Sequence, residues 1–192
     1  MDRRGVLRLL GSSTAAAAIP GELAALGRSV HGALGRATDV HTLDPHQNAT
    51  VVALTDLILP ATDTPGAKAA RVNEFIDVLL TDWYDPADRD RFLAGLADVD
   101  ARARAAFGKT FVEGSAEQQG AVVQGLDDEA TRWKASPEAG RGSTPFSREL
   151  KWLTLFGYYT SEIGAVQEQH FEIIPNRYAP CEPLHGSSPA PG

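Results

Sequence analysis

Histidine and serine are the residues of this chain with the most obvious catalytic potential, but their spacing does not support catalysis. His41, His46, His170 and His185 form no HExxH or similar pair, so they do not predict a zinc site. Ser161 lies in GYYTSEIG, without the GxSxG elbow that exposes a nucleophilic serine. We therefore expect these side chains to be surface, tail or packing residues, with no catalytic residue and no metal site.

Two other chemical patterns are equally weak. Asp127, Asp128 and Glu129 are consecutive, and neighbours on a helix do not face one another, so we expect a solvated acidic face. The glycine-containing stretches at 31–35 and 66–72 have no preceding strand, which a phosphate-binding loop requires. The sequence predicts no cofactor-binding residue in this chain.

The single cysteine, Cys181, excludes an internal disulfide and any zinc or iron–sulfur site built from several cysteines of this chain. In an exported protein such a residue is either a free thiol or half of a bridge to another chain. Both alternatives stay open at this point.

Aromatic and apolar residues near the C-terminus point to a partner. Tyr158 and Tyr159, followed by Glu162, fit two interpretations: Tyr159 packs in the core with its hydroxyl on a backbone group, or the cluster contacts another protein. In the proline-rich tail, Tyr178, Cys181 and Leu184 favour a contact, because apolar groups are rarely left clustered in water.

The N-terminus resembles a twin-arginine export signal. Arg3 and Arg4 precede a short apolar stretch and the small residues Ala15 to Ala18. We assign residues 1–40 to this signal and a linker, and the twin-arginine translocase becomes an expected partner. An amphipathic helix of the mature protein is the alternative. Ala15 to Ala18 fits an A-x-A cleavage pattern but comes early, so the site of cleavage stays open.

Charge and hydropathy exclude two functional classes. The formal net charge is −7 and the pI about 5.2, whereas a nucleic-acid surface needs a basic stripe. After the N-terminal signal, no stretch reaches the roughly 18 apolar residues of a membrane span.

Helix signals recur along the body and position the candidates above. Asp44-Pro45, Asp85-Pro86 and Thr144-Pro145 mark helix starts, SAEQ at 115–118 is a capping box, and Pro60 and Gly108 mark ends. We expect helices near 45–59, 67–83, 86–107 and 116–133, and a fifth from 145. The fold class is all-α: a bundle of about five to six helices over 41–184, with an extended C-terminal tail whose residues 185–192 are disordered.

Residues 54–103 and 149–184 resemble the gluconate 2-dehydrogenase subunit 3 family. The resemblance rests on the run LPATDTPGA, a following helix with Phe-Ile and Trp-Tyr, and ELKWLTLFGYYTSEIGAVQEQHFEIIPNRYAPCEPL. The family pattern has Ile-Pro where this chain has Leu59-Pro60.

The resemblance implies a small, non-catalytic, periplasmic subunit. Its partner would be an FAD-containing catalytic subunit of the glucose–methanol–choline type, which oxidises a sugar, a sugar acid or the 3-hydroxyl of a glycoside. A cytochrome c subunit would receive the electrons in some such complexes, and the complex would associate with the membrane. In the family the small subunit carries the export signal for the flavoprotein and aids its folding.

The resemblance also gives the candidate contacts a partner. Cys181 would bridge to, or pack against, the flavoprotein. In the loop at 60–67, Asp63 would cap the next helix while Pro65 fixes a turn against the partner. The alternative function is a stand-alone periplasmic enzyme or ligand-binding module whose site the sequence does not reveal.

Overall fold

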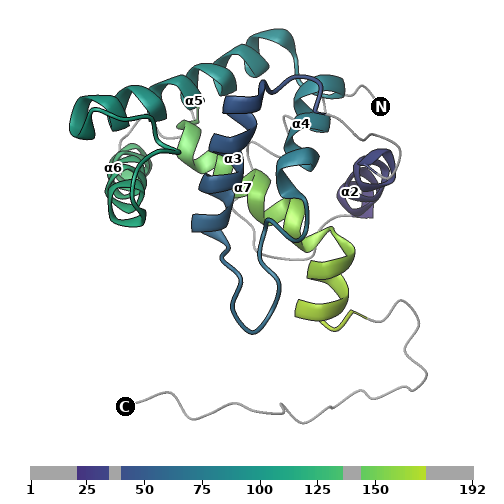
Figure 1. Cartoon of the computed structure of the whole chain (residues 1–192). Helices are drawn as coiled ribbons and strands as arrows, with labels where there is room; N and C mark the ends of the chain where they lie inside the picture. The colour runs from purple at the N-terminus through teal and green to yellow at the C-terminus, as the bar shows by residue number, and fades with distance from the viewer. Residues whose placement is uncertain (1–20, 35–39, 136–143, 172–192) are drawn as a thin grey trace.

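The computed structural model describes residues 21–34, 40–135 and 144–171, and all regular structure in these ranges is helical (Figure 1). The prediction of an all-α bundle is confirmed. The elements are α2 (Gly21–Leu34), α3 (Pro45–Ile58), α4 (Val72–Asp82), α5 (Pro86–Phe107), α6 (Ala116–Ala135), α7 (Phe146–Tyr159) and the π-helix η1 (Ile163–Glu168).

Local capping chemistry that the sequence predicts sets three of the helix boundaries. The Asp44 carboxylate accepts a hydrogen bond from the Gln47 N–H at 2.8 Å, and the Gln47 side chain accepts one from the Asp44 N–H. Ser115 and Gln118 form the same reciprocal pair before α6. Gly108 ends α5 at φ 72°, in the left-handed region that glycine adopts without strain.

The start of α4 differs from the prediction. The helix expected from Ala67 begins only at Val72, because Arg71 has left-handed backbone angles of φ 54° and ψ 40°. Residues 67–70 instead form a turn, and the Ala67 N–H donates to the Leu59 carbonyl across the preceding loop. The left-handed angles of Arg71 separate this turn from α4, and the apolar spacing alone does not reveal them.

The last long helix, α7, lies at the centre of the fold and contacts α3, α4 and α6 (Figure 1). Its inner face carries Leu150, Leu153 and Tyr158, each at most 2% exposed, and these join Phe75 of α4 and Leu54 of α3 in one core. Burial of each such side chain stabilises the folded protein by about 1.5–3 kcal/mol. None of the helices in the described ranges has the length and apolarity needed to cross a bilayer.

The segment assigned to signal and linker contributes a helix to this fold. Within residues 1–40, α2 (Gly21–Leu34) packs against α4, and its Leu26 and Val30 are 7% and 1% exposed. The helical body therefore begins before residue 41, because α2 shares its core.

A buried carboxylate anchors the chain just before α3. Asp77 of α4 is 1% exposed and accepts hydrogen bonds from the backbone N–H groups of His41, Thr42 and Leu43 at 2.7–2.9 Å. Three donors on one carboxylate satisfy a charge that would otherwise be costly to bury. Asp77 thus fixes where α3 enters the bundle.

Candidate functional site

The loop between α3 and α4 is fastened to the core by a tyrosine. The Tyr158 hydroxyl donates a 2.7 Å hydrogen bond to the Pro65 carbonyl, and Pro65 is half-buried. At Gly66 a Cβ atom would lie 2.6 Å from the Leu59 carbonyl oxygen. Only glycine therefore lets the two ends of the loop approach this closely. These contacts hold Pro65 and Gly66 against the core, and the turn of this segment follows them at residues 67–71.

Asp63 does not cap a helix, contrary to the prediction. Its exposed carboxylate accepts a hydrogen bond from the Thr62 hydroxyl at 2.9 Å, while the N-cap residue of α4 is Arg71. The pKa of Asp63 lies below its ordinary value, chiefly because of the Thr62 hydrogen bond. Because α4 starts later than predicted, its N-cap residue lies eight positions after Asp63 in the sequence. Asp63 remains a negative charge at the tip of an exposed loop.

The role that the core interpretation gives to Tyr159 belongs to Tyr158 instead. Tyr158 is buried, with its hydroxyl on a backbone carbonyl, and Tyr159 is only partly buried. Tyr158 is 1% exposed and offers almost no surface for contact with another protein, whereas Tyr159 and the exposed Glu162 do. Successive side chains on a helix point about 100° apart. A cluster of aromatic residues in the sequence therefore does not show which of two neighbours is buried.

Sequence reasoning missed two further exposed apolar residues on the same helix. Trp152 and Leu155 are 37% and 38% exposed, and with Tyr159 they are spaced i, i+3 and i+7 on one face of α7. We call Trp152, Leu155 and Tyr159 the α7 outer stripe. Trp152 is held in place by stacking on Phe156, with ring centroids 4.9 Å apart. The helical spacing was visible in the sequence, but not which face would be left uncovered.

A shallow groove lies beside this helix, between α3, α6 and α7. Its volume is about 160 Å³, its floor includes Leu54, Leu126 and Leu150, and Leu57, which is 39% exposed, lines it. Asp127 and Lys151 stand at its rim, 3.7 Å apart. Small-molecule sites usually exceed roughly 300 Å³. The groove suits a single inserted side chain better than a nucleotide cofactor.

The catalytic candidates have structural roles. The Ser161 hydroxyl donates to the Tyr158 carbonyl at 2.6 Å and accepts from the Gly164 N–H, so it ends α7 and starts η1. Asp127, Asp128 and Glu129 are exposed and turn to three different partners, Lys151, Gln124 and Arg102. Their exposure agrees with the solvated acidic face expected from the sequence.

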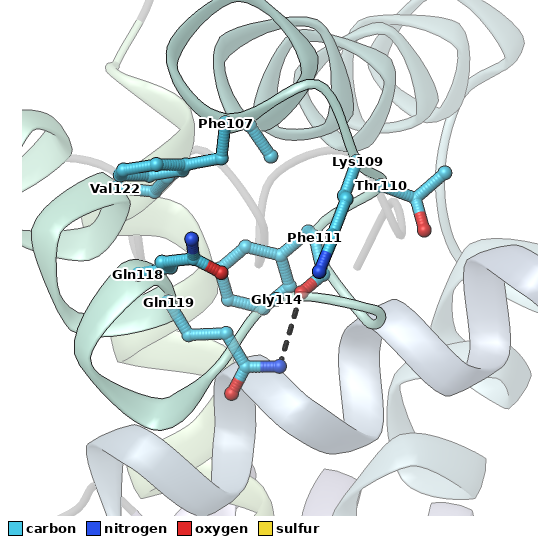
Figure 2. A pocket seen from close by; sticks show the side chains of 9 residues that line it. Phe107, Lys109, Thr110, Phe111, Gly114, Gln118, Gln119 and Val122 are labelled. Atoms are coloured by element: carbon cyan, nitrogen blue, oxygen red, sulfur yellow. Dashed lines mark hydrogen bonds between the residues drawn. The ribbon is translucent and has the colours of Figure 1, made fainter.

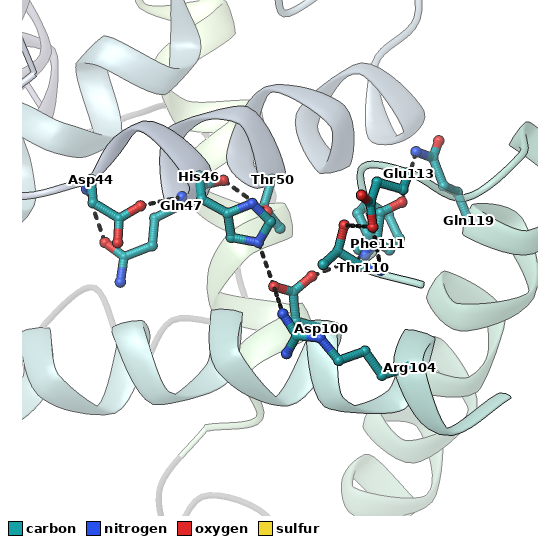
Figure 3. A network of polar contacts seen from close by, with 10 residues as sticks. All are labelled: Asp44, His46, Gln47, Thr50, Asp100, Arg104, Thr110, Phe111, Glu113 and Gln119. Carbon is teal, nitrogen blue, oxygen red and sulfur yellow. Dashed lines mark hydrogen bonds and ion pairs between the residues drawn. The ribbon is translucent and has the colours of Figure 1, made fainter. Parts of the chain in front are cut away.

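The polar network most similar to a catalytic pair joins His46 and Asp100 (Figure 3). His46 Nε2 lies 2.5 Å from one oxygen of Asp100, whose other oxygen accepts from the Phe111 N–H at 2.9 Å. Arg104 Nη2 lies 3.6 Å from the same carboxylate. Burial acts to raise the pKa of Asp100, but the hydrogen bonds from Phe111 and His46 and the charges of His46 and Arg104 outweigh it and lower the pKa.

This network connects three segments of the chain. Asp100 lies on α5, His46 on α3 and Phe111 in the α5–α6 connection, so one carboxylate ties three segments together. Neither the groove nor a second hollow, near Phe111, is lined by His46 or Asp100. In Figure 2 the second hollow lies between α5 and α6, where Gln119 donates to the Phe111 carbonyl, and it is too tight to enclose a water molecule.

The remaining predicted residues lie outside the described ranges. These are the export-signal residues Arg3 and Arg4 and the tail residues Tyr178, Cys181 and Leu184. Within the described ranges, no three His, Cys, Asp or Glu residues gather in a way that could hold a metal ion.

Comparison with known proteins gives one match. The family model described as gluconate 2-dehydrogenase subunit 3 matches residues 45–175, more than half of the chain. This range runs from the first residue of α3 past the end of η1. No curated protein and no solved structure matches.

Proposed function

Because the chain belongs to the gluconate 2-dehydrogenase subunit 3 family, we propose that it is the non-catalytic small subunit of a periplasmic, FAD-dependent sugar, sugar-acid or glycoside 3-dehydrogenase. The family match over residues 45–175 is the observation that carries this proposal. The flavin and the reacting alcohol belong to a catalytic subunit of the glucose–methanol–choline type. A cytochrome c subunit completes the electron path where the complex has one.

The small subunit supplies the export address. Arg3 and Arg4 precede the apolar stretch of a twin-arginine signal, a route read by a receptor rather than by the fold. In this proposal the flavoprotein folds in the cytoplasm around its cofactor, binds this chain and crosses with it. The complex then associates with the periplasmic face of the membrane.

The flavoprotein binds the outer surface of α7 and the segments beside it. The α7 outer stripe supplies an exposed tryptophan and a tyrosine, and such residues dominate binding energy at interfaces. Glu162 lies just beyond α7, and Leu57 of the groove adds an apolar contact. Asp63 at its loop tip is a peripheral contact.

The tail extends this interface in the proposal. Tyr178 and Leu184 contribute apolar surface, and Cys181 packs against the flavoprotein or forms a disulfide with it. A non-reducing gel of the purified complex tests the bridge: a high-mass band should disappear on reduction and in Cys181→Ser. A band that survives in Cys181→Ser excludes the bridge and leaves packing.

Co-expression tests the function as a whole. The chain is expressed with a neighbouring flavoprotein that lacks a signal of its own, and the dehydrogenase activity of the periplasm is measured with and without this chain. We expect co-purification, and active flavoprotein in the periplasm only when both chains are present. Active flavoprotein exported without this chain contradicts the proposal.

The double variant Arg3→Lys/Arg4→Lys tests the export signal separately from assembly of the complex. It keeps the charge and removes the arginine pair that the translocase receptor recognises, so both subunits should stay in the cytoplasm as an assembled, active complex. Arg8→Lys, a conservative change in the same segment, is the matched control and should leave export unchanged. Periplasmic activity in the double variant would show that export does not depend on this signal.

A further inference from the structure

Helix α2 makes contacts that an export signal would not need. Gly27 faces Thr160 so closely that a Cβ atom would lie 2.8 Å from the threonine Cβ and Cγ2. One turn later, His31 Nε2 lies 3.1 Å from both the Gly157 carbonyl oxygen and Thr160 Oγ1. Gly27 therefore lets α2 pack closely on the end of α7, and His31 adds hydrogen bonds to the same place.

The surface that α2 contacts forms only when α4 and α7, which are distant in the sequence, are already packed together. The His31 ring stacks on Phe75 of α4 with centroids 4.9 Å apart. Gly157 of α7 in turn fits against Phe75, because a Cβ atom there would lie 2.8 Å from the phenyl ring. Phe75 thus contacts both α2 and α7, and α2 can dock only on an assembled α4–α7 pair.

The sequence alone leaves the end of the N-terminal signal ambiguous. Small residues two apart, which fit an A-x-A-like cleavage pattern, occur at Ala16–Ala18, at Ala25–Gly27 and at Ala33–Gly35. Cleavage after Gly27 would remove Leu26 and the close contact with Thr160, and cleavage after Gly35 would remove the whole helix. Either cut would remove Leu26 and leave a gap in the core, and the cut after Gly35 would also remove His31, which covers Phe75 and Gly157.

We propose that α2 is a permanent element of the mature protein, so that the export signal ends before Gly21 and any peptidase cuts on that side. The signal then precedes, in the sequence, a helix that is held in place by the completed α4–α7 packing, which links presentation of the signal to folding of the body. This inference rests on the proposed export function for the role of the signal, but the docking of α2 can be tested independently of it.

The N-terminus of the exported chain is the first test. The complex is purified from the periplasm, and the intact mass and N-terminal sequence of the small subunit are determined. We expect a chain that starts at Gly21 or earlier. A start at any residue after Gly21 overturns the proposal. A chain found only in the cytoplasm contradicts the export function instead, and the second test then decides about α2.

Trypsin cleavage after Arg28 is the second test, since this exposed residue lies on α2 beside the contact residue Gly27. Gly27→Val forces a side chain against Thr160 and should speed cleavage after Arg28 by roughly tenfold, because cleavage requires local release of the helix. Ala25→Val introduces the same side chain at an exposed position of α2 and is the matched control, with an unchanged rate.

His31→Ala provides an independent variant, because it removes the ring that contacts Phe75 and Gly157 without adding volume. It should also speed cleavage after Arg28. If the unaltered protein is cut there as fast as both variants, α2 is not docked and the proposal is wrong. The rate of cleavage at arginines of α5 reports whether the body of each variant is folded.

Discussion

The hydroxyl of Tyr158 reaches the carbonyl oxygen of Pro65 at 2.7 Å, across 93 residues of sequence. The bond joins the last long helix to the loop between α3 and α4, the segment that carries Asp63. The position of this loop is therefore set by the core of the protein and not by a helix cap within the loop. The same bond links the loop directly to α7.

Removing the Tyr158 hydroxyl should loosen the loop. Tyr158→Phe leaves the Pro65 carbonyl without its partner and should lower the free energy of unfolding by about 1 kcal/mol. Tyr159→Phe is the matched control, at a neighbouring and less buried ring. Asp63→Ala should leave the free energy of unfolding nearly unchanged, because its exposed carboxylate caps no helix. Urea denaturation measures all three, and a larger loss in Asp63→Ala than in Tyr158→Phe contradicts this assignment.

Asp77 should be among the least replaceable polar residues. Asp77→Ala leaves three backbone N–H groups without an acceptor at the entry to α3, and should destabilise the protein by about 3 kcal/mol or more. Asp82→Ala, at an exposed position of the same helix, should stay within about 0.5 kcal/mol of the unaltered protein. Thermal unfolding followed by circular dichroism compares the two. Equal melting temperatures would show that the segment 41–43 does not depend on the carboxylate.

Glu149 should make the protein less stable as pH rises. Burial raises the pKa of this carboxyl group, against the opposing effect of the hydrogen bond that the Tyr84 hydroxyl donates to it at 2.8 Å. The folded state therefore holds a proton that the unfolded state releases near its ordinary pKa, so stability falls as pH rises from the unfolded to the folded pKa. Glu149→Gln keeps the acceptor and removes the charge.

We expect Glu149→Gln to be more stable than the unaltered protein at pH 7, and the difference to disappear as pH falls below the ordinary glutamate value. Urea denaturation at a series of pH values from 3.5 to 7 measures this difference. Glu117→Gln, at an exposed position of α6, is the control. A Glu149→Gln variant that is less stable at pH 7 would show that the ionised carboxylate is favourable in this site.

His31 should have the opposite pH dependence. Burial lowers its pKa, although the hydrogen bond with the Gly157 carbonyl acts to raise it. The unfolded chain then binds a proton more readily than the folded one, so stability is lost as pH falls from the ordinary histidine value toward the folded pKa. His31→Phe keeps a ring against Phe75 and cannot take up a proton.

The stability of His31→Phe should therefore fall less between pH 7.5 and 5.5 than that of the unaltered protein. Urea midpoints at the two pH values give the comparison. His170→Phe, at an exposed position, serves as control. Parallel losses in His31→Phe and the unaltered protein would assign the acid sensitivity to other groups.

The α7 outer stripe should matter for assembly and not for folding. Trp152→Ala removes the largest exposed ring of the stripe and should weaken binding of the flavoprotein by about 30-fold, the effect of losing a hot spot of about 2 kcal/mol. Val112→Ala changes an equally exposed apolar residue in the α5–α6 connection and should leave binding unchanged. Surface plasmon resonance with the immobilised flavoprotein gives both dissociation constants. Equal constants would place the interface on another face.

The sequence by itself determined the helical fold and most of its boundaries. The cap at Asp44, the capping box at Ser115 and the left-handed Gly108 act within a few residues of the chain, so they can be recognised locally. The family could likewise be recognised from the motifs of residues 54–103 and 149–184.

The tertiary structure decided what depends on contacts between distant residues. Only the packed fold shows that Arg71 breaks a helix expected to start at Ala67, and that Tyr158 rather than Tyr159 is buried. Only the fit of Gly27 and His31 onto Thr160 and Gly157 reveals α2 as part of the body. Helical periodicity states which residues share a face, but a neighbouring element decides whether that face is covered.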